Sequence, residues 1–535
     1  MVTNKVIEVK VTVMKIYNKK KYLIIAAMLI SLVIYVGINH DPVMESSIVV
    51  DKTPLSQQSS RIRPNIVVIV IDALRADHLG GYGYSRDTSP FIDELMQQGI
   101  RFENAIANSS YTGESVSSLF TGKFPSSNPY GAGWYARPAP DSDTLAKLFQ
   151  KSGYKTGLFC DTPVLGPHFY EGFDTTACMV SDFGFSGTGP LVVEKALEFI
   201  KNDTNEPFFV YLHFLDPHSP YEPSTSDYLR FSDSIYQQPL RLFEDIRPKL
   251  PELITEGFGP GNAAFEDLKL RYDAEIVFVD NCIRSFFESM KKNNMSDNLI
   301  VVVTSDHGEE FLDNGFLEHA WRLYWESIHI PLIIWAPDFV VSGNMKEPVS
   351  LVDIAPTLLS LAALQFDAGI FDGHSLFTKT KLGTYTPVSH GKPIISELLL
   401  QTRPIIRSII HGDYQYIAAW QWCDPPTCSA DAIRQFEWRE KLKKGEIQPV
   451  DPWGTIVHEE LIFSPGNGGK VDNLLLKEPD QVSTFRSLLD NYHTRVPNQV
   501  DDKKKLETYK LGTSEENIQQ GAQEMRQQME TLGYL

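Results

Sequence analysis

The sequence predicts an α/β fold in which helices cover both faces of a largely parallel sheet. Short apolar runs rich in β-branched residues alternate with helical patterns as far as about residue 380. The runs are continuously apolar, which is typical of parallel strands buried on both faces. With 535 residues, 42% of them hydrophobic, the chain is long enough to enclose one large core or two unequal ones.

Five runs predict the strands, at 65–72, 155–160, 208–214, 298–306 and 330–337. The helices between them include residues 89–99, where Ser89 is placed to cap the helix and Pro90 to occupy its first position. A second helical pattern covers residues 273–292. Residues 222–271 predict a connection long enough to shape access to a site, although a plain structural insertion fits them equally well.

The C-terminal part has a different pattern. After about Thr380 shorter segments such as "PIIRSIIHGDYQYIAAW" predict a small antiparallel sheet beside the main one. We therefore expect a catalytic domain over 64–380, a C-terminal subdomain over 381–490 and a helical tail over 491–535.

The N-terminal part predicts a membrane anchor. Residues 22–38 carry no charge, three lysines stand directly before them, and acids follow. This length and charge pattern indicate a single transmembrane helix with residues 1–21 in the cytoplasm. Residues 39–63, rich in Ser, Gln and Pro, would be a stalk, and the catalytic domain would lie outside the cytoplasm. A cleaved signal peptide is the alternative, but no small-x-small cleavage site follows the run.

Charge and cysteine content exclude two classes of protein. The net charge of -19 argues against a nucleic-acid partner, which needs clustered Lys and Arg. Five cysteines in so long a chain are too few for a disulfide scaffold. Cys423 and Cys428, in "CDPPTC", are close enough in sequence to suggest a bond, with two unpaired thiols as the alternative.

Polar side chains gather where the predicted strands end. Asp72 ends the first strand, Asp216 and His218 follow "FFVYLHF", and Asp306 and His307 follow "NLIVVVTS". Because ligands bind beyond the carboxyl ends of parallel strands, we expect these side chains to converge. Taken alone, an Asp after a strand is often only a turn or cap residue. Together, two carboxylates and an imidazole from Asp72, Asp306 and His307 predict a site for zinc, manganese or magnesium.

Several stretches resemble the sulfatase-like branch of the alkaline phosphatase superfamily. The opening "RPNIVVIVIDALRADHLGGYGYSRDTSPFIDELMQQGIRFENAIA" is followed, in the family's order, by "TSDHGEEF", "YWESIHIPLIIWAP", "VSLVDIAPTLLSLAAL", "EELIFSPGNGGKVDNLLLKEPD" and "METLGYL". The resemblance covers roughly residues 64–490 plus the end of the chain. It implies an alkaline-phosphatase-like α/β/α sandwich with a small C-terminal subdomain, and a metal-assisted nucleophile that attacks a phosphate or sulfate ester.

The stretch "SSYTGESVSSLFTG" carries the nucleophile that the resemblance implies. Family sulfatases open C/S-x-P-x-R with a residue that is oxidised to formylglycine, whereas alignment here places Thr112, Glu114 and Val116 at the Cys/Ser, Pro and Arg positions. A threonine cannot become formylglycine. The segment resembles the threonine version found in the family's phosphodiesterases and its phosphoethanolamine and phosphoglycerol transferases. Ser110 and Ser115 are competing hydroxyls that fall off the aligned position.

The metal expectation follows from a second departure from the family pattern. Formylglycine sulfatases carry paired Asp residues that help to hold calcium, but here Ala73 follows Asp72. Fewer oxygen ligands favour zinc or manganese, with magnesium and calcium as alternatives and Thr112 as a fourth ligand.

The remaining site residues are assigned by the same resemblance. His218, in "DPHSPY", would donate a proton to the leaving group or contact an oxyanion. His319, in "GFLEHAW", would share that role or bind a second metal or substrate oxygens. Asp216 would complete a second metal site with these histidines or simply cap the turn at Pro217. The role of Arg75 is left open.

The sequence therefore predicts a membrane-anchored, extracytoplasmic hydrolase or transferase that acts on phosphate esters through Thr112. The substrate would be a small molecule, a glycan or a lipid. Two alternatives stay open: a sulfatase that works without formylglycine, and a non-catalytic binding protein that kept the fold. Trp134, Trp321 and Trp325 could stack on a sugar or lie against lipid, although buried aromatic residues are commoner.

Overall fold

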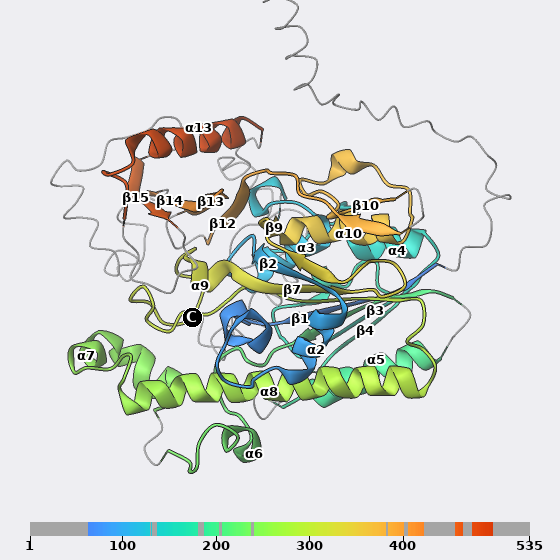
Figure 1. Ribbon diagram of the computed structural model, residues 1–535, viewed down its shortest axis with the longest axis horizontal. Helices are drawn as coiled ribbons and strands as arrows, with labels where there is room; N and C mark the ends of the chain where they lie inside the picture. Colours follow the sequence, from blue (N-terminus) through green and yellow to red (C-terminus); the bar gives the residue numbers. More distant parts are fainter. Residues whose placement is uncertain are drawn as a thin grey trace, which may run out of the picture. The chain divides into compact units, whose positions relative to one another are not determined.

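The computed structural model describes residues 63–128, 130, 136–179, 187–202, 206–236, 240–380, 384–400, 405–421, 455–463 and 473–495. A nine-stranded sheet lies at the centre, in the order β4-β3-β5-β1-β6-β7-β2-β8, with β9 paired to β2 (Figure 1). Its strands are β1 (Asn65–Ile71), β2 (Ile100–Ile106), β3 (Lys155–Cys160), β4 (Thr175–Cys178), β5 (Phe208–Phe214), β6 (Leu299–Ser305), β7 (His329–Trp335), β8 (Gly343–Met345) and β9 (Val349–Ser350).

The sheet is mostly parallel, as predicted. β4, β3, β5, β1 and β6 run side by side in one direction. β7 is antiparallel to both β6 and β2. All five predicted strands are present, and the reversal of β7 was not foreseen because a continuous apolar run does not encode its direction.

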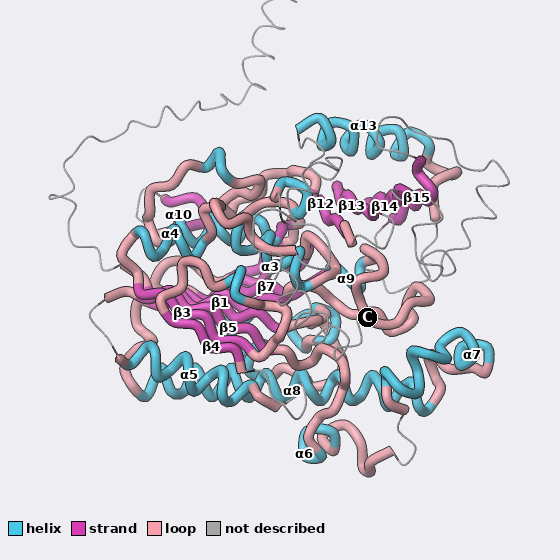
Figure 2. The backbone as a smooth tube through the Cα atoms, turned by 180° about the vertical axis from the view of Figure 1, so that it is seen from behind, coloured by secondary structure: helices cyan, strands magenta, loops and turns pink. Residues whose placement is uncertain are grey.

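Helices cover both faces of the sheet (Figures 1 and 2). On one face lie α2 (Pro90–Gln98), α5 (Gly189–Lys201) and α8 (Ala263–Lys292); on the other lie α3 (Thr112–Thr121), α4 (Leu145–Lys151) and α10 (Ile354–Leu361). The side chains of β1 supply both cores in alternation: Val68 and Val70 belong to the core under α3, and Val67 and Ile69 to the core under α8.

The region 222–271 is more helical than predicted. It contains α6 (Thr225–Tyr228), α7 (Leu250–Thr255) and the first turns of α8. Asn262 starts α8, because its side-chain oxygen accepts hydrogen bonds from the amides of Ala264 and Phe265. The helix predicted at 273–292 thus begins ten residues earlier, at Ala263.

A separate four-stranded antiparallel sheet forms the predicted C-terminal subdomain. Its strands are β12 (Ile394–Leu398), β13 (Ile405–His411), β14 (Tyr414–Gln421) and β15 (Thr455–Phe463), in that order across the sheet. Helix α13 (Pro479–Arg495) packs on it through Phe485 and Leu489, which meet Ile409 and Tyr416. The smaller elements are α9 (Trp325–Ile328), β10 (Phe377–Lys379) and β11 (Tyr385–Pro387).

The structure corrects the expectation of a single-pass membrane protein. In the ranges that the structure describes, no helix has both the length and the apolar character needed to cross a membrane. The run 22–38 on which the expectation rested, the stalk at 39–62 and the tail from 496 onward lie outside the described residues.

One disulfide bond is present that the sequence did not point to. Cys160 and Cys178 end β3 and β4 and face each other in the register of these two parallel strands. Strand register thus brings together two residues that are 18 apart in sequence. Cys423 and Cys428, the pair favoured from the sequence, lie outside the described residues.

Candidate active site

Two adjacent strands bring the predicted metal ligands together. β1 leads into Asp72, and its neighbour β6 leads into Asp306 and His307. One ligand atom from each of these three residues lies within 4.8 Å of the other two, and all three side chains are buried. Of the side chains expected to converge at the strand ends, these three do so.

The hydrogen bonds of this cluster leave room for a cation. Asp306 Oδ1 accepts hydrogen bonds from the amides of Ala73 (3.3 Å) and His307 (2.9 Å). Asp306 Oδ2 and Asp72 Oδ1 are buried and have no hydrogen-bond partner in the described part of the chain. His307 Nδ1 donates to the carbonyl of Gly308 (2.9 Å), which leaves the Nε2 lone pair facing the carboxylates. Two orphaned carboxylate oxygens and an imidazole nitrogen fit a divalent metal ion.

The electrostatics of the cluster support this interpretation. Burial raises the pKa of Asp72, but His218 and His213 outweigh this effect and hold that pKa well below its usual value. Burial and the charge of Asp72 raise the pKa of Asp306. The pKa of His307 is raised by Asp306 and Asp72, although burial opposes them. The centre thus attracts positive charge, either as a proton on His307 or as a cation.

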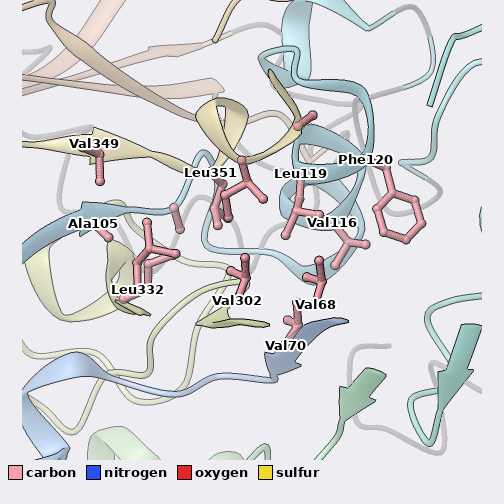
Figure 3. Close-up of a cluster of buried hydrophobic side chains, with 14 of the residues drawn as sticks. Val68, Val70, Ala105, Val116, Leu119, Phe120, Val302, Leu332, Val349 and Leu351 are labelled. Carbon is pink, nitrogen blue, oxygen red and sulfur yellow. The ribbon is translucent and has the colours of Figure 1, made fainter. Parts of the chain in front are cut away.

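Thr112 lies at this cluster. It is the first residue of α3, and its Oγ1 lies 3.1 Å from His307 Nε2. Because Nδ1 of that histidine carries the proton, the Thr112 hydroxyl is the donor in this hydrogen bond. Val116 and Leu119 anchor α3 on the sheet, close to Val68 (Figure 3).

The two competing hydroxyls are turned away. Ser110 Oγ donates to the carbonyl of Arg322 (2.7 Å), and Ser115 Oγ donates to the carbonyl of Ser109 (2.8 Å). Both serines serve the backbone of the loop rather than the cluster. This arrangement favours Thr112 over either serine as the nucleophile.

The C-terminal subdomain holds the loop before α3. Within β12, Ser396 Oγ donates to the carbonyl of Ala107 (2.6 Å). The amide of Glu397 donates to the carbonyl of Asn108 (2.8 Å). Glu114, which stands where the family motif has proline, is fully buried and accepts the Leu399 amide (3.2 Å). The carboxylate thus ties the start of α3 to the strand edge of the subdomain.

His218 and His319 lie beside the cluster. The His319 ring stacks on that of His307 at 4.3 Å and meets the His218 ring edge-on at 4.8 Å. His319 Nδ1 bonds Glu309 Oε1 (2.9 Å), and Tyr221 donates to the other oxygen of that carboxylate (2.9 Å). Sequence reasoning missed Glu309, although its place directly after "DHG" was a signal that could have found it.

Asp216 and Arg75 point elsewhere. Asp216 Oδ2 accepts the amide of Gly187 (3.3 Å), and burial together with Asp161 raises the pKa of Asp216 to about 8. It is not part of the metal-ligating group found among the described residues. Arg75 bonds Asp77 and Asp313 and donates to the Glu309 carbonyl (3.1 Å).

Of the three tryptophans considered from the sequence, two are described. Trp325 stacks on His329 with ring centroids 4.4 Å apart, and Trp321 is partly buried. Trp134 lies outside the described residues. The Trp325 ring thus packs against a neighbouring side chain.

Comparison with known proteins agrees with this geometry. The family profile described as "Sulfatase" matches residues 64–364, more than half of the chain. The chain belongs to the sulfatase family. It is 22% identical over 396 residues to an N-acetylglucosamine-6-O-sulfatase of Bacteroides thetaiotaomicron, a match that covers 59% of this chain and 70% of that protein. An arylsulfatase of Hemicentrotus pulcherrimus is 23% identical over 386 residues, covering 61% and 64%.

Solved structures share the fold. A structure described as a complex with its substrate D-glucosamine-2-N,6-O-disulfate has a TM-score of 0.64 at 18% identity, covering 82% of this chain and all of that one. The phosphonate monoester hydrolase of Agrobacterium radiobacter has a TM-score of 0.58 at 16% identity, covering 82% and 97%. The family predicted from the sequence motifs is thereby confirmed. The chain is an enzyme of the sulfatase family.

Proposed function

We propose that this sulfatase-family chain hydrolyses sulfate esters through Thr112, without formylglycine. The observation that carries the proposal is the position of the Thr112 hydroxyl, 3.1 Å from His307 Nε2 and at the Asp72, Asp306 and His307 cluster. The relatives named as sulfatases favour a sulfate ester over the phosphate ester that the threonine motif alone suggested. The name of one of them, N-acetylglucosamine-6-O-sulfatase, also favours a sulfated sugar as the substrate.

Asp72, Asp306 and His307 would hold the divalent cation, with zinc or manganese favoured because Ala73 supplies no side-chain oxygen. A cation bound there would lower the pKa of the Thr112 hydroxyl and neutralise charge on the ester oxygens.

The remaining steps belong to side chains of this chain. Thr112 releases its proton to water, its Oγ1 bonds to sulfur, and the bond from sulfur to the ester oxygen breaks. That oxygen takes a proton from His319 or His218, whose rings lie beside the cluster. Water then attacks the same sulfur, releasing sulfate and restoring the hydroxyl.

A phosphate or phosphonate ester is the second candidate substrate. Two observations favour it: the threonine at the nucleophile position and the shared fold of the phosphonate monoester hydrolase. The same residues would act, with phosphorus in place of sulfur, and an acceptor alcohol in place of water would make the enzyme a transferase.

Rates on matched esters separate these functions. Purified protein with added zinc or manganese should release nitrophenol from para-nitrophenyl sulfate faster than from the corresponding phosphate, phosphodiester or phenylphosphonate. A clear preference for a phosphorus ester would move the assignment to the second candidate. No release from any ester, with a cation bound, would favour a non-catalytic binding protein.

A further inference from the structure

Behind Asp72 lies a second pair of buried polar side chains, which the sequence did not single out. Tyr211 and His213 stand two residues apart on β5 and so share one face of that strand. The Tyr211 hydroxyl lies 2.9 Å from His213 Nδ1, and His213 Nε2 lies 3.3 Å from Asp72 Oδ2. None of the three side chains is more than 1% exposed.

The direction of each hydrogen bond in this chain follows from chemistry. An ionised carboxylate only accepts, so His213 Nε2 carries the proton that Asp72 receives. In the tautomer with its proton on Nε2, Nδ1 of the same ring is an acceptor, and Tyr211 is the donor to it. Burial, Asp306 and Asp72 raise the pKa of Tyr211 well above its usual value, so the phenol keeps the proton it donates.

We propose that Tyr211 and His213 form a buried relay that orients Asp72 and thereby sets the affinity of the site for its divalent cation. His213 engages Oδ2, and this leaves Oδ1, which has no partner in the described ranges, turned toward Asp306 and His307. Hydrogen bonds behind a ligand fix its orientation and commonly change metal affinity by about 10- to 100-fold.

The relay is also packed against the helix that carries the nucleophile. The Tyr211 ring meets Phe120 of α3 edge-on, with centroids 4.8 Å apart. Tyr211→Phe would keep this packing and remove only the hydroxyl. Tyr211 and His213 are therefore positioning residues that act through Asp72, and the inference rests on the proposed metal site.

The chain offers a matched control. Tyr154 is also a buried tyrosine of the same hydrophobic core, and its hydroxyl has no hydrogen-bond partner in the described part of the chain. Tyr154→Phe deletes a comparable hydroxyl without touching the relay. The test is calorimetric titration of zinc, and separately of manganese, into metal-stripped full-length parent, Tyr211→Phe and Tyr154→Phe proteins, with thermal melts of each.

We expect Tyr211→Phe to weaken cation binding about tenfold or more, while Tyr154→Phe binds like the parent. In a second pair, His213→Gln keeps an N–H donor and should bind the cation more tightly than His213→Leu. Equal affinities for the parent, Tyr211→Phe and Tyr154→Phe would overturn the relay and leave the metal site standing. A parent that binds neither cation would overturn the metal site itself.

Discussion

Two groups of buried carboxylates lie at the same edge of the central sheet and are stabilised in opposite ways. Asp72 and Asp306, after β1 and β6, are flanked by imidazoles, and each keeps one oxygen without a hydrogen-bond partner in the described ranges. Asp161 and Asp216, after β3 and β5, have no histidine among the hydrogen-bond partners that the described residues provide.

The second group is satisfied by the protein itself. Asp161 accepts the Leu215 amide (2.6 Å) and the Thr188 hydroxyl (2.8 Å). Burial raises the pKa of Asp161 to about 6, and burial with the charge of Asp161 raises that of Asp216 to about 8. Burial and position are thus alike in the two groups, and the neighbouring side chains differ. A carboxylate that follows a strand indicates a cation site when imidazoles lie beside it and one of its own oxygens has no hydrogen-bond partner.

The nucleophile should give the largest effect. Thr112→Ala should lower turnover about a thousandfold or more, because no hydroxyl then faces His307. Thr112→Ser should retain part of the activity. The measurement is kcat on the preferred ester, with Ser110→Ala as the control that remains active. If Thr112→Ala and Ser110→Ala lowered kcat equally, the hydroxyl at the cluster would be no more important for turnover than one that bonds the backbone.

The proton donor should give the next largest effect. His218→Asn should lower kcat about a hundredfold or more on an alkyl ester, whose leaving oxygen needs a proton. The loss should be much smaller on a nitrophenyl ester, whose leaving group departs as an anion. If His319→Asn shows this dependence on the leaving group and His218→Asn does not, the proton comes from His319.

Protein stability should depend on the second acid group. Folding holds a proton on Asp216 between its ordinary pKa of 3.8 and about 8, whereas the unfolded chain releases it. The free energy of unfolding should therefore fall as pH rises through this window, by up to about 1.4 kcal/mol per pH unit. Denaturant titrations at pH 6 and pH 8 should show this fall in the parent and a smaller one in Asp216→Asn. Identical slopes would contradict the neutral Asp216.

Ala73 should give the smallest effect. It follows Asp72 with φ of 57°, a left-handed conformation that glycine adopts without strain. Ala73→Gly should raise the free energy of unfolding by roughly 1 kcal/mol, and its amide should still donate to Asp306. Chemical denaturation measures the change, and a loss of stability would show that the conformation is not strained.

The sequence predicted the site residues that stand at strand ends or in a family motif. Asp72, Asp306 and His307 follow strands, and a strand end is visible in sequence. Thr112 came from a family motif. The parallel sheet itself followed from continuous apolar runs.

The parts that depend on strand order could not be predicted. His213 reads as one residue of a buried strand, and only the pairing of β5 with β1 brings it to Asp72. Cys160 and Cys178 meet because β3 and β4 are neighbours in register. The phosphate preference inferred from Thr112 alone is not favoured by the relatives, because a nucleophile does not by itself specify the atom it attacks.

Metal content tests the central claim most directly. Parent, Asp306→Asn and Asp216→Asn proteins should be loaded with zinc or manganese, desalted and measured by elemental mass spectrometry. We predict one cation per chain in the parent and in Asp216→Asn, and a sharp loss in Asp306→Asn, because an amide is a poorer ligand than a carboxylate. Equal cation content in all three proteins, or a loss in Asp216→Asn alone, would contradict the assignment.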